Sequence, residues 1–567
     1  MHGRLKVRTS EEQAEAKRRE QQEKLKIYSE ITVTFFILNR DAKEFDEEAL
    51  ELTARILEKN PDFYTLWNYR REILQFLKNE KAEEEIKRLS LIELDLTQNC
   101  LKVNPKSYSA WHHRFWAMEF NPEGDWKREL KLCNFFLSQD ERNFHCWDYR
   151  RLVCKKCNVS CEEELDYSTT LIEKNFSNYS AWHYRSTLLP IVHYDASKNS
   201  VKEDVLLKEF HLIQNAAFTD PDDQSVWFYH RWLLGRRKMP LQILNLSVLK
   251  PQNTIVVLFS EPVQVDNENL HVTLNEKSVP VSWHPINGSL ASTVWTCNLP
   301  ASMQEVENSL QGDRNFEIGV KFSIGKEECC LSSTINGNTS FVWKNMSRAE
   351  TFRSDFSAAT IDVLKRELES CQQLNELEPD CKWTLFTCVL LMRALNNPKF
   401  QREIEDFMEK LTVVDASRKN YYKDLGSKFT IEDTIENLPV DATELNLSNK
   451  KLTSLCHFDQ LILIEKINLS QNNLTSINPL KYLICVKSIN LDDNQLFSLE
   501  GIEELKNLEQ LSLKRNSLKK INVLDGLKTC VNLKELFLEG NPLTEDPQYL
   551  QTLQMLSMLK LIDGSDL

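Results

Sequence analysis

Amphipathic runs alternate with short polar breaks over the first 240 residues. In the run 47–59 (EEALELTARILEK), apolar residues recur three and four positions apart, which is the spacing of one helix face. The pair Asn60-Pro61 follows, and a second run then carries Trp67. Because proline disfavours the helical conformation of the residue before it, the pair ends the first helix. The pattern predicts two helices joined by a tight turn.

This helix–turn–helix unit occurs five times before residue 240. Each unit carries a Trp followed by an Arg, and successive Trp residues are 44, 36, 35 and 45 positions apart. The five segments are Trp67–Arg70, Trp111–Arg114, Trp147–Arg150, Trp182–Arg185 and Trp227–Arg231. Two-helix repeats of this length are typical of an α-solenoid, an α/α superhelix in which helical hairpins stack in a row.

The Trp and the Arg of a unit share a helix face, because residues three apart are neighbours on a helix. Packing inside the hairpin is the simplest role for the Trp. The Arg is always charged, so its repetition beside the Trp indicates a recurrent ion pair or stacking role along one edge of the solenoid.

A different pattern occupies residues 241–348. Val, Ile and Thr alternate with other residues in Thr254–Phe259, Leu270–Leu274 and Phe316–Phe322, and Gly, Pro and Asn separate these runs. Such runs predict a compact all-β domain, here an immunoglobulin-like sandwich. A helix is predicted again over Ala349–Leu374, before a sixth Trp.

The sixth helical unit carries Trp383, but Phe386 stands where the Arg would be. The unit is therefore a degenerate member of the series. Because it resumes the helical pattern, the β segment is interpreted as an insertion between the fifth and sixth hairpins.

A second repeat begins near residue 443. The pairs Leu445/Leu447, Ile467/Leu469, Ile489/Leu491, Leu511/Leu513 and Leu536/Leu538 are spaced by 22, 22, 22 and 25 residues. Asn472, Asn494, Asn516 and Asn541 follow three residues later in four of the units, and Lys450 takes that place in the first. This is the leucine-rich repeat pattern, in which the Asn side chain bonds the backbone of the turn. It predicts a C-terminal leucine-rich repeat domain.

Composition excludes several classes of function. The chain has only 13 Gly among 567 residues and no GxGxxG. The segment from Gly319 to Glu327 resembles a P-loop most, but it has the wrong glycine spacing and ends in Glu instead of Ser or Thr. The standard glycine-rich nucleotide loops are therefore excluded. A net charge of −14 argues against non-specific nucleic-acid binding.

The N-terminal residues give no secretory signal. The first residues, Met1 to Lys6, lead into a charged run with no apolar stretch, and residues 11–26 are almost wholly polar, as in a solvated helix or frayed arm. Apolar runs such as Ile31–Leu38 are too short to span a membrane. The 15 Cys are therefore interpreted as reduced thiols of a cytoplasmic protein.

Three of these cysteines, Cys154, Cys157 and Cys161, are close enough in the sequence to suggest a zinc site instead. However, Ser160 and Glu163 form a capping box, so Cys161 opens a new helix while the other two end the previous one. No metal ligand set is predicted in this chain. His112, His113, His183 and His230 adjoin the repeat Trp residues and are interpreted as packing or edge residues, because no catalytic triad is visible.

The Trp-x-x-Arg units behind Asn-Pro turns resemble the repeats of protein prenyltransferase alpha subunits. The β insertion and the leucine-rich repeats resemble the Rab-specific branch of that family, whereas other branches have a shorter alpha subunit. The resemblance implies four regions: helical units one to five (1–240), the inserted sandwich (241–348), a helical continuation (349–440) and leucine-rich repeats (441–567).

The resemblance also implies partners and chemistry. The chain would form a heterodimer with a beta subunit that binds zinc and geranylgeranyl diphosphate. The acceptors would be C-terminal cysteines of Rab GTPases presented by an escort protein. The family motif Lys-x-Tyr-x-x-Trp matches Lys106, Tyr108 and Trp111, and its Lys and Tyr meet the diphosphate leaving group.

Local chemistry agrees with this assignment of Lys106 and Tyr108. Lys106 follows Pro105 near a helix start, where free N–H groups and the helix dipole favour an anion. The simpler interpretation of Lys106 is a solvated surface lysine without a catalytic role. The alternative function is a non-catalytic adaptor built from helical and leucine-rich repeats, although the Gly and Ala pattern of tetratricopeptide units is missing.

Overall fold

The structure is a computed structural model of the chain. It describes residues 45–566 and positions 15, 18, 19 and 22, with gaps at 197–199, 236–240, 250–253, 267, 287, 299–315, 326, 336–340, 345–351, 354–355, 357–358, 440–441 and 555. The run Ile31–Leu38, and residues 11–26 apart from those four positions, lie outside the described residues. The chain divides into two compact units, one formed by residues up to Ala217 with Asp223–His230 and the other by Phe218–Asp222 with Arg231–Leu567.

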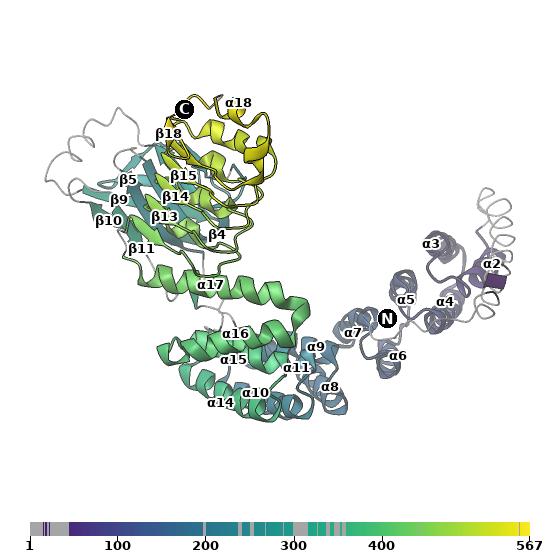
Figure 1. Ribbon diagram of the computed structural model, residues 1–567. Helices are drawn as coiled ribbons and strands as arrows, with labels where there is room; N and C mark the ends of the chain where they lie inside the picture. The colour runs from purple at the N-terminus through teal and green to yellow at the C-terminus, as the bar shows by residue number, and fades with distance from the viewer. Residues whose placement is uncertain are drawn as a thin grey trace. The chain divides into compact units, whose positions relative to one another are not determined.

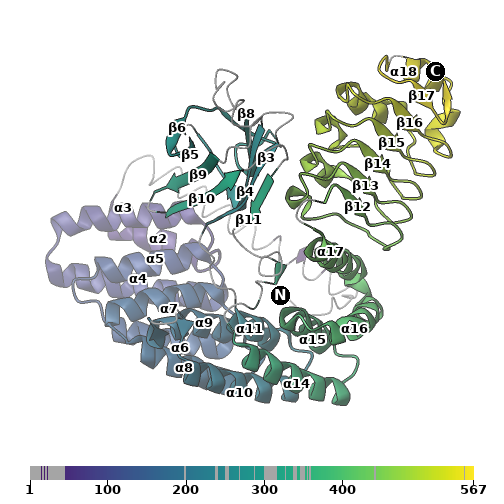
Figure 2. The ribbon, with the colours of Figure 1, turned by 90° about the vertical axis from the view of Figure 1, so that its left-hand side faces the viewer.

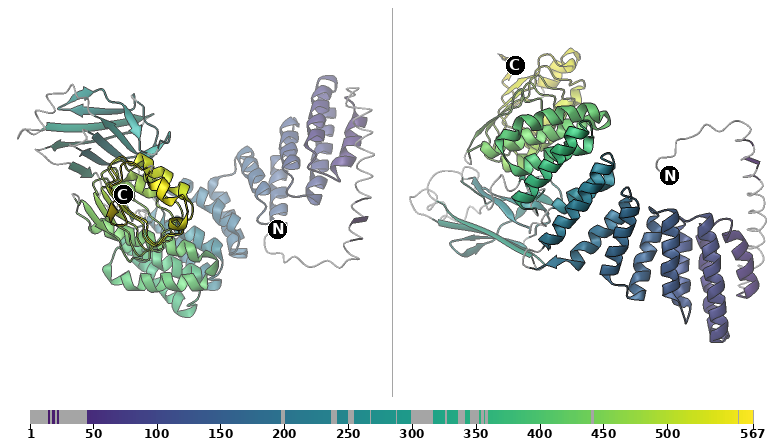
Figure 3. Two further views of the ribbon diagram at one scale, coloured as in Figure 1. Left: turned by 45° about the horizontal axis from the view of Figure 1, so that its top comes forward. Right: turned by 90° about the horizontal axis from the view of Figure 1, so that it is seen from below.

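The helices before the β insertion form antiparallel hairpins that follow one another along the chain (Figures 1 and 2). They are α2 (Glu47–Leu57), α3 (Tyr64–Glu80), α4 (Glu83–Val103), α5 (Tyr108–Phe120), α6 (Trp126–Gln139), α7 (Phe144–Cys157), α8 (Cys161–Lys174), α9 (Tyr179–Val192), α10 (Glu203–Thr219) and α11 (Gln224–Leu234). A short β1–β2 ladder (Tyr194–Asp195 with Ser200–Val201) lies between α9 and α10. Figure 3 shows the same succession of hairpins from below. The predicted α-solenoid is confirmed.

The repeat Trp residues have the predicted packing role. Trp67 and Trp182 are each 1% exposed. Their indole N–H groups donate to the carbonyl oxygen six residues earlier, at 2.8 Å from Trp67 to Pro61 and 2.7 Å from Trp182 to Phe176. Trp111 and Trp147 make the same bond. Each Trp thus fixes the turn that joins its two helices, and a buried N–H finds its partner.

The repeat Arg residues form ion pairs between successive hairpins. The pairs are Arg70–Glu93, Arg114–Glu129, Arg150–Glu164 and Arg185–Glu209. The predicted recurrent ion pair is confirmed, but its predicted place along an edge is wrong, because each pair is buried. The fifth unit differs, since the Arg231 guanidinium lies over the rings of Trp383 and Phe386, 5.4 and 5.3 Å from their centroids.

The β insert, residues 243–344, consists of two antiparallel sheets. Their strands are β3 (Ile243–Leu249), β4 (Thr254–Val263), β5 (Leu270–Leu274), β6 (Lys277–Val279), β7 (Trp283–Pro285), β8 (Ser292–Asn298), β9 (Phe316–Ile324), β10 (Glu327–Ile335) and β11 (Phe341–Lys344). The sheet orders are β10-β9-β5-β6 and β11-β3-β4-β8-β7. Residues such as Val257 and Val320 from the two sheets share one apolar core. The predicted β-rich insertion is confirmed.

Helices resume after the insert with α14 (Ile361–Leu377), α15 (Lys382–Leu395), α16 (Gln401–Val414) and α17 (Lys419–Asn437). The predicted helix over Ala349–Leu374 is confirmed from Ile361 onward, where Thr360 caps α14 with its hydroxyl oxygen on the N–H of Val363, and Ala349 itself lies outside the described residues. Helices α16 and α17 form one more hairpin without a Trp. In its place the Tyr422 hydroxyl donates to Asp415 in the turn, at 2.9 Å.

The last part of the chain, residues 442–566, is a second solenoid of short strands (Figure 1). The strands are β12 (Glu444–Asn446), β13 (Lys466–Asn468), β14 (Ser488–Asn490), β15 (Gln510–Ser512), β16 (Glu535–Phe537), β17 (Leu561–Ile562) and β18 (Ser565–Asp566). β12 to β17 pair in parallel, and their leucines and isoleucines form one core, which Ile431 and Ile435 of α17 join.

The asparagines of this C-terminal solenoid bond the backbone as predicted. The Asn494 amide donates to the carbonyl oxygens of Leu469 and Leu491, both at 3.0 Å, and its oxygen accepts the N–H of Leu474 at 3.0 Å. Asn472, Asn516 and Asn541 make equivalent bonds. Each Asn thereby ties its own turn to the preceding repeat.

Candidate functional site

Lys106 and Tyr108 lie at the start of α5, as predicted. The side chain of Ser107 caps the helix by accepting the N–H of Ala110 at 3.3 Å. The N–H of Lys106 donates to the Asn104 side chain at 3.1 Å, which closes the turn before the helix. The first turn of α5 carries no acidic residue, so its positive dipole end is not offset there.

Tyr108 presents its ring to solvent and to the next hairpin. Its exposed fraction is 70%, although tyrosine rings usually find apolar cover. The ring centroid lies 4.2 Å from that of His145, with the two planes nearly perpendicular, and 6.0 Å from that of Phe144. The structure thus brings together the starts of α5 and α7, which belong to successive repeats.

His145 is a residue of this site that the sequence analysis missed. It lies two residues before Trp147, where the other four units carry Thr65, Ser109, Ser180 and Ser225. A histidine at a position that is Ser or Thr in the other units is the feature of the sequence that indicates His145. Burial lowers the pKa of His145, and nearby Lys106 lowers it further, while Asp148 and Asp62 act in the opposite direction. The imidazole is therefore neutral at neutral pH and offers one N–H donor.

The cationic group of the site is held by a carboxylate. The Lys106 ammonium lies 3.4 Å from Oδ2 of Asp140, and the two side chains are 51% and 38% exposed. An exposed pair of this kind is weak, so an incoming anion can displace the carboxylate. The cluster therefore combines an ammonium that can exchange its carboxylate partner for an anion, a phenol and a neutral imidazole. Together these groups suit the binding of a multiply charged anion.

A stripe of exposed aromatic residues follows the same helix starts. Three residues before the repeat Trp, four successive units carry Tyr64, Tyr108, Phe144 and Tyr179. All four are 45% exposed or more. Exposed apolar groups that recur along one edge are typical of a protein interface, where they lose contact with water.

The other candidates from the sequence do not form a site. Cys154 is buried in α7, and Ser160 caps α8 by accepting the N–H of Glu163 at 3.1 Å, as the capping box predicts. Within the described ranges, no three His, Cys, Asp or Glu side chains are placed to hold one metal ion. All 15 cysteines are free thiols.

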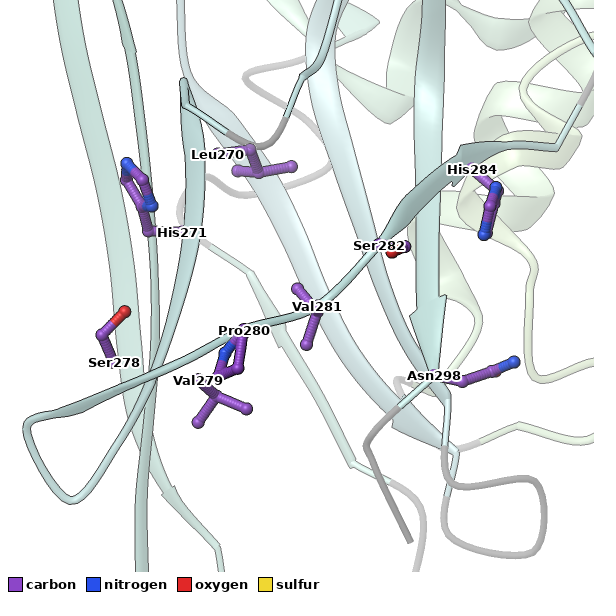
Figure 4. Close-up of a pocket in the computed structure, with 9 residues that line it drawn as sticks. All are labelled: Leu270, His271, Ser278, Val279, Pro280, Val281, Ser282, His284 and Asn298. Atoms are coloured by element: carbon purple, nitrogen blue, oxygen red, sulfur yellow. The ribbon is translucent and has the colours of Figure 1, made fainter. Parts of the chain in front are cut away.

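A hollow of about 700 Å³ lies at the open edge of the β insert, between β6 and β7 (Figure 4). His271 and His284 line its opposite ends, and the His271 ring donates to the carbonyl oxygen of Glu268 at 2.9 Å. The two imidazoles are thus not arranged for joint chemistry. No helix among the described residues is long and apolar enough to cross a membrane.

Comparison with known proteins places these features in a family. The protein prenyltransferase alpha subunit repeat matches residues 46–77, 92–120, 126–157, 161–191 and 206–237. The insert domain of the Rab geranylgeranyl transferase alpha subunit matches residues 243–334. The geranylgeranyl transferase type-2 subunit alpha of Sus scrofa is 45% identical over 472 residues, which are 82% of either chain. The chain belongs to the geranylgeranyl transferase type-2 alpha-subunit family.

Other members of the family are also similar over most of the chain. The Homo sapiens protein is 44% identical over 82% of each chain, and that of Dictyostelium discoideum is 32% identical over 76% of this chain and all of its own. A solved structure of the Candida albicans protein geranylgeranyltransferase-I complexed with GGPP shares 25% identity over 37% of this chain and 66% of its own, with a TM-score of 0.31. Membership of the family rests on the full-length relatives and the matched repeats.

Proposed function

We propose that this chain is the alpha subunit of a heterodimeric transferase that moves geranylgeranyl groups from geranylgeranyl diphosphate to C-terminal cysteines of Rab GTPases. Membership of the type-2 alpha-subunit family carries this proposal. The Rab substrates would be presented by an escort protein. The enzyme is proposed to be cytoplasmic, and the free thiols of the chain agree with that location.

The proposed organisation has four regions: helical units one to five over 1–240, an immunoglobulin-like sandwich over 241–348, a helical continuation over 349–440 and leucine-rich repeats over 441–567. Two antiparallel sheets around one core support the sandwich assignment. Parallel strands with an asparagine ladder support the leucine-rich repeats.

The partner of the helical units is proposed to be a beta subunit that covers the aromatic stripe. Tyr64 and Tyr108, with exposed fractions of 67% and 70%, would lose water contact in such an interface. Aromatic side chains contribute much of the binding energy in protein interfaces because they bury large areas at little entropic cost. The zinc of the enzyme is assigned to the beta subunit, where it would hold and activate the substrate thiolate.

In the proposed reaction, the thiolate sulfur of the acceptor cysteine attacks C1 of the prenyl chain. A carbon–sulfur bond forms, the bond between C1 and the phosphate oxygen breaks, and diphosphate leaves with the bonding electrons. Negative charge grows on the leaving group in the transition state. Lys106 and Tyr108 would stabilise this charge by donating hydrogen bonds, and His145 would add a third donor from its neutral ring.

Substitution of Lys106 in the assembled heterodimer tests this role. We expect Lys106→Ala to slow single-turnover prenyl transfer by about 10²-fold, because one preorganised cationic donor to the leaving group is lost. Lys102→Ala is the matched control, since Lys102 is an exposed lysine on the last turn of α4. An unchanged rate for Lys106→Ala in an intact complex would show that the assignment is wrong.

Purification distinguishes the adaptor hypothesis from the enzyme hypothesis. The proposal requires a tightly bound beta subunit that carries zinc, and transfer activity only when both chains are present. A zinc-free monomer that is stable alone and forms no complex with a beta subunit would favour the adaptor.

A further inference from the structure

We infer that Asp140 is a positioning residue for Lys106, and that its charge sets how tightly the site holds the departing diphosphate. This inference rests on the proposed role of Lys106. Asp140 precedes α7 and meets the Lys106 ammonium through Oδ2 at 3.4 Å.

A comparison of the repeats shows that the turn itself does not need this charge. Asp140 lies seven residues before its Trp, where units one, two and four carry Asn60, Asn104 and Asn175 and the fifth carries Asp220. In the turns of the first four units the side-chain oxygen accepts the backbone N–H two residues later, at 3.0 to 3.3 Å. Asparagine makes this bond as well as aspartate does. The turn bond therefore does not require the charge of Asp140.

The second polar side-chain atom of this turn residue contacts the preceding repeat. There Asn104 meets an acid and Asp140 meets a base. The Asn104 amide donates to Oδ2 of Asp62 at 2.9 Å. Lys106 occupies the position in its repeat that Asp62 occupies in the one before, five residues ahead of the Trp. Between repeats one and two the partner is an acid and the turn supplies an amide donor, whereas between repeats two and three the partner is a base and the turn supplies a carboxylate. The next junction is different, because Arg142 donates to the Ser177 carbonyl oxygen and the turn residue Asn175 donates to Glu141. Between repeats two and three the charge of Asp140 is thus opposite to that of the side chain it meets, Lys106.

Two effects on an anion follow from this arrangement. The carboxylate holds the ammonium at the edge of the cluster before the anion arrives, and it must then give up the ammonium to the anion. After that exchange Asp140 lies beside a ligand of its own sign. Both effects weaken the binding of diphosphate and speed its release. The change in binding free energy cannot exceed the free energy of an exposed ion pair.

Asp140→Asn in the heterodimer tests the inference, with inorganic diphosphate as the probe. Asparagine keeps the turn bond and removes only the charge. We expect the inhibition constant of diphosphate against geranylgeranyl diphosphate to fall by about two- to fivefold, the factor that an exposed pair supplies. Damage to the fold would weaken binding, so tighter binding separates positioning from a structural role.

The same substitution in the Lys106→Ala background shows whether Asp140 acts through Lys106. There we expect a change of less than about 1.5-fold, because the remaining repulsion acts through solvent and is screened. An equal gain in both backgrounds, or no gain with Lys106 present, would overturn the inference. Asp140→Ser, which can also close the turn, serves as a second variant if Asp140→Asn assembles poorly.

The outcomes also separate this inference from the proposed function. If Lys106→Ala leaves both prenyl transfer and diphosphate inhibition unchanged, the proposed role of Lys106 fails. If Lys106→Ala impairs both but Asp140→Asn does not tighten inhibition, only the positioning role of Asp140 fails.

Discussion

The helical repeats and the C-terminal solenoid join successive units by opposite chemistry. In the helical repeats a buried charge pair such as Arg114–Glu129 links one hairpin to the next, and both residues are 1% exposed. In the C-terminal solenoid a neutral amide such as Asn494 makes the link. An Arg side chain spans the distance between packed helices, whereas strands about 4.8 Å apart are close enough for an Asn.

The two kinds of link differ in the free energy needed to bury them. A buried ion pair must repay the desolvation of two charges, which it does only when every donor and acceptor is satisfied. Glu129 accepts two bonds from Arg114 and one from the Tyr149 hydroxyl, each at 2.7 Å. An amide link needs no such compensation. The helical repeats should therefore be more sensitive to substitution and to pH than the C-terminal solenoid.

The largest effect is expected from Glu129→Gln. It leaves the Arg114 guanidinium buried without its counter-charge, so unfolding of the helical repeats should become easier by about 3–5 kcal/mol. Urea unfolding followed by tryptophan fluorescence measures this, because Trp111 and Trp147 lie in the two joined hairpins. The control is Arg151→Ala, which breaks the exposed pair with Asp148 and should cost less than about 1 kcal/mol. Equal losses would remove the contrast between buried and exposed charges.

A smaller loss is expected from Asn494→Ala in the C-terminal solenoid. The substitution leaves the Leu474 N–H and the carbonyl oxygens of Leu469 and Leu491 without their partner, at a cost of about 2–3 kcal/mol. Thermal unfolding of the full chain measures the change. Asn473→Ala, at an exposed neighbouring position, should change stability by less than about 0.5 kcal/mol. A loss for Asn494→Ala that exceeds that of Glu129→Gln would reverse the order of the two links.

The smallest effect is expected from His113→Tyr. His113 donates to Glu93 at 2.8 Å where later repeats use Tyr149, Tyr184 and Tyr229, and its Nδ1 is buried without a hydrogen-bond partner. Tyrosine restores the hydrogen-bond pattern of the other repeats, so stability at neutral pH should fall by only about 1 kcal/mol, the low end of the usual cost of adding volume to a packed core.

The pH dependence of this variant should differ from that of the original chain. Burial lowers the pKa of His113, although its bond to Glu93 acts the other way. A base with a lowered folded-state pKa takes up its proton more readily in the unfolded chain, so stability falls as pH drops below about 6.5. His113→Tyr should remove this part of the loss in melting temperatures measured between pH 5 and 7.5. Identical pH profiles would show that His113 does not titrate on unfolding.

Below the pH range of His113, protonation of its partner Glu93 should reduce the stability of the helical repeats further. Burial alone would raise the pKa of Glu93, but Arg70 and His113 bring it down to about 2. A carboxyl with a lowered pKa contributes stability above its unfolded value near 4.5, and that contribution is lost as pH falls toward 2. The amide links of the C-terminal solenoid have no such titration.

Much of this architecture was predictable because it depends on local periodicity. The Trp residues and Asn-Pro turns predicted the first five hairpins, and the 22-residue leucine spacing predicted the strands of the C-terminal solenoid. The hairpin of α16 and α17 was not predicted as a repeat, because Tyr422 replaces the Trp that marks the others. The start of α14 was placed too early, since local pattern did not show which of several polar residues caps the helix.

The candidate site was predictable only in part for the same reason. Lys106 and Tyr108 share one helix start and one motif, so they could be found together. His145 and Asp140 lie more than 30 residues further along, and no motif links them to Lys106. Only the stacking of the second hairpin against the third brings their side chains within reach of Lys106 and Tyr108.

Local sequence pattern is enough to predict the repeats, the two solenoids and the β-rich insertion, because hydrophobic spacing, prolines and capping residues act over a few neighbouring positions. The tertiary structure alone decided which groups meet across repeats. The glutamates that pair with Arg70, Arg114, Arg150 and Arg185 lie 23, 15, 14 and 24 residues away, so no fixed spacing identifies them. Loop lengths between hairpins vary while the packing geometry does not, and the geometry selects the partner.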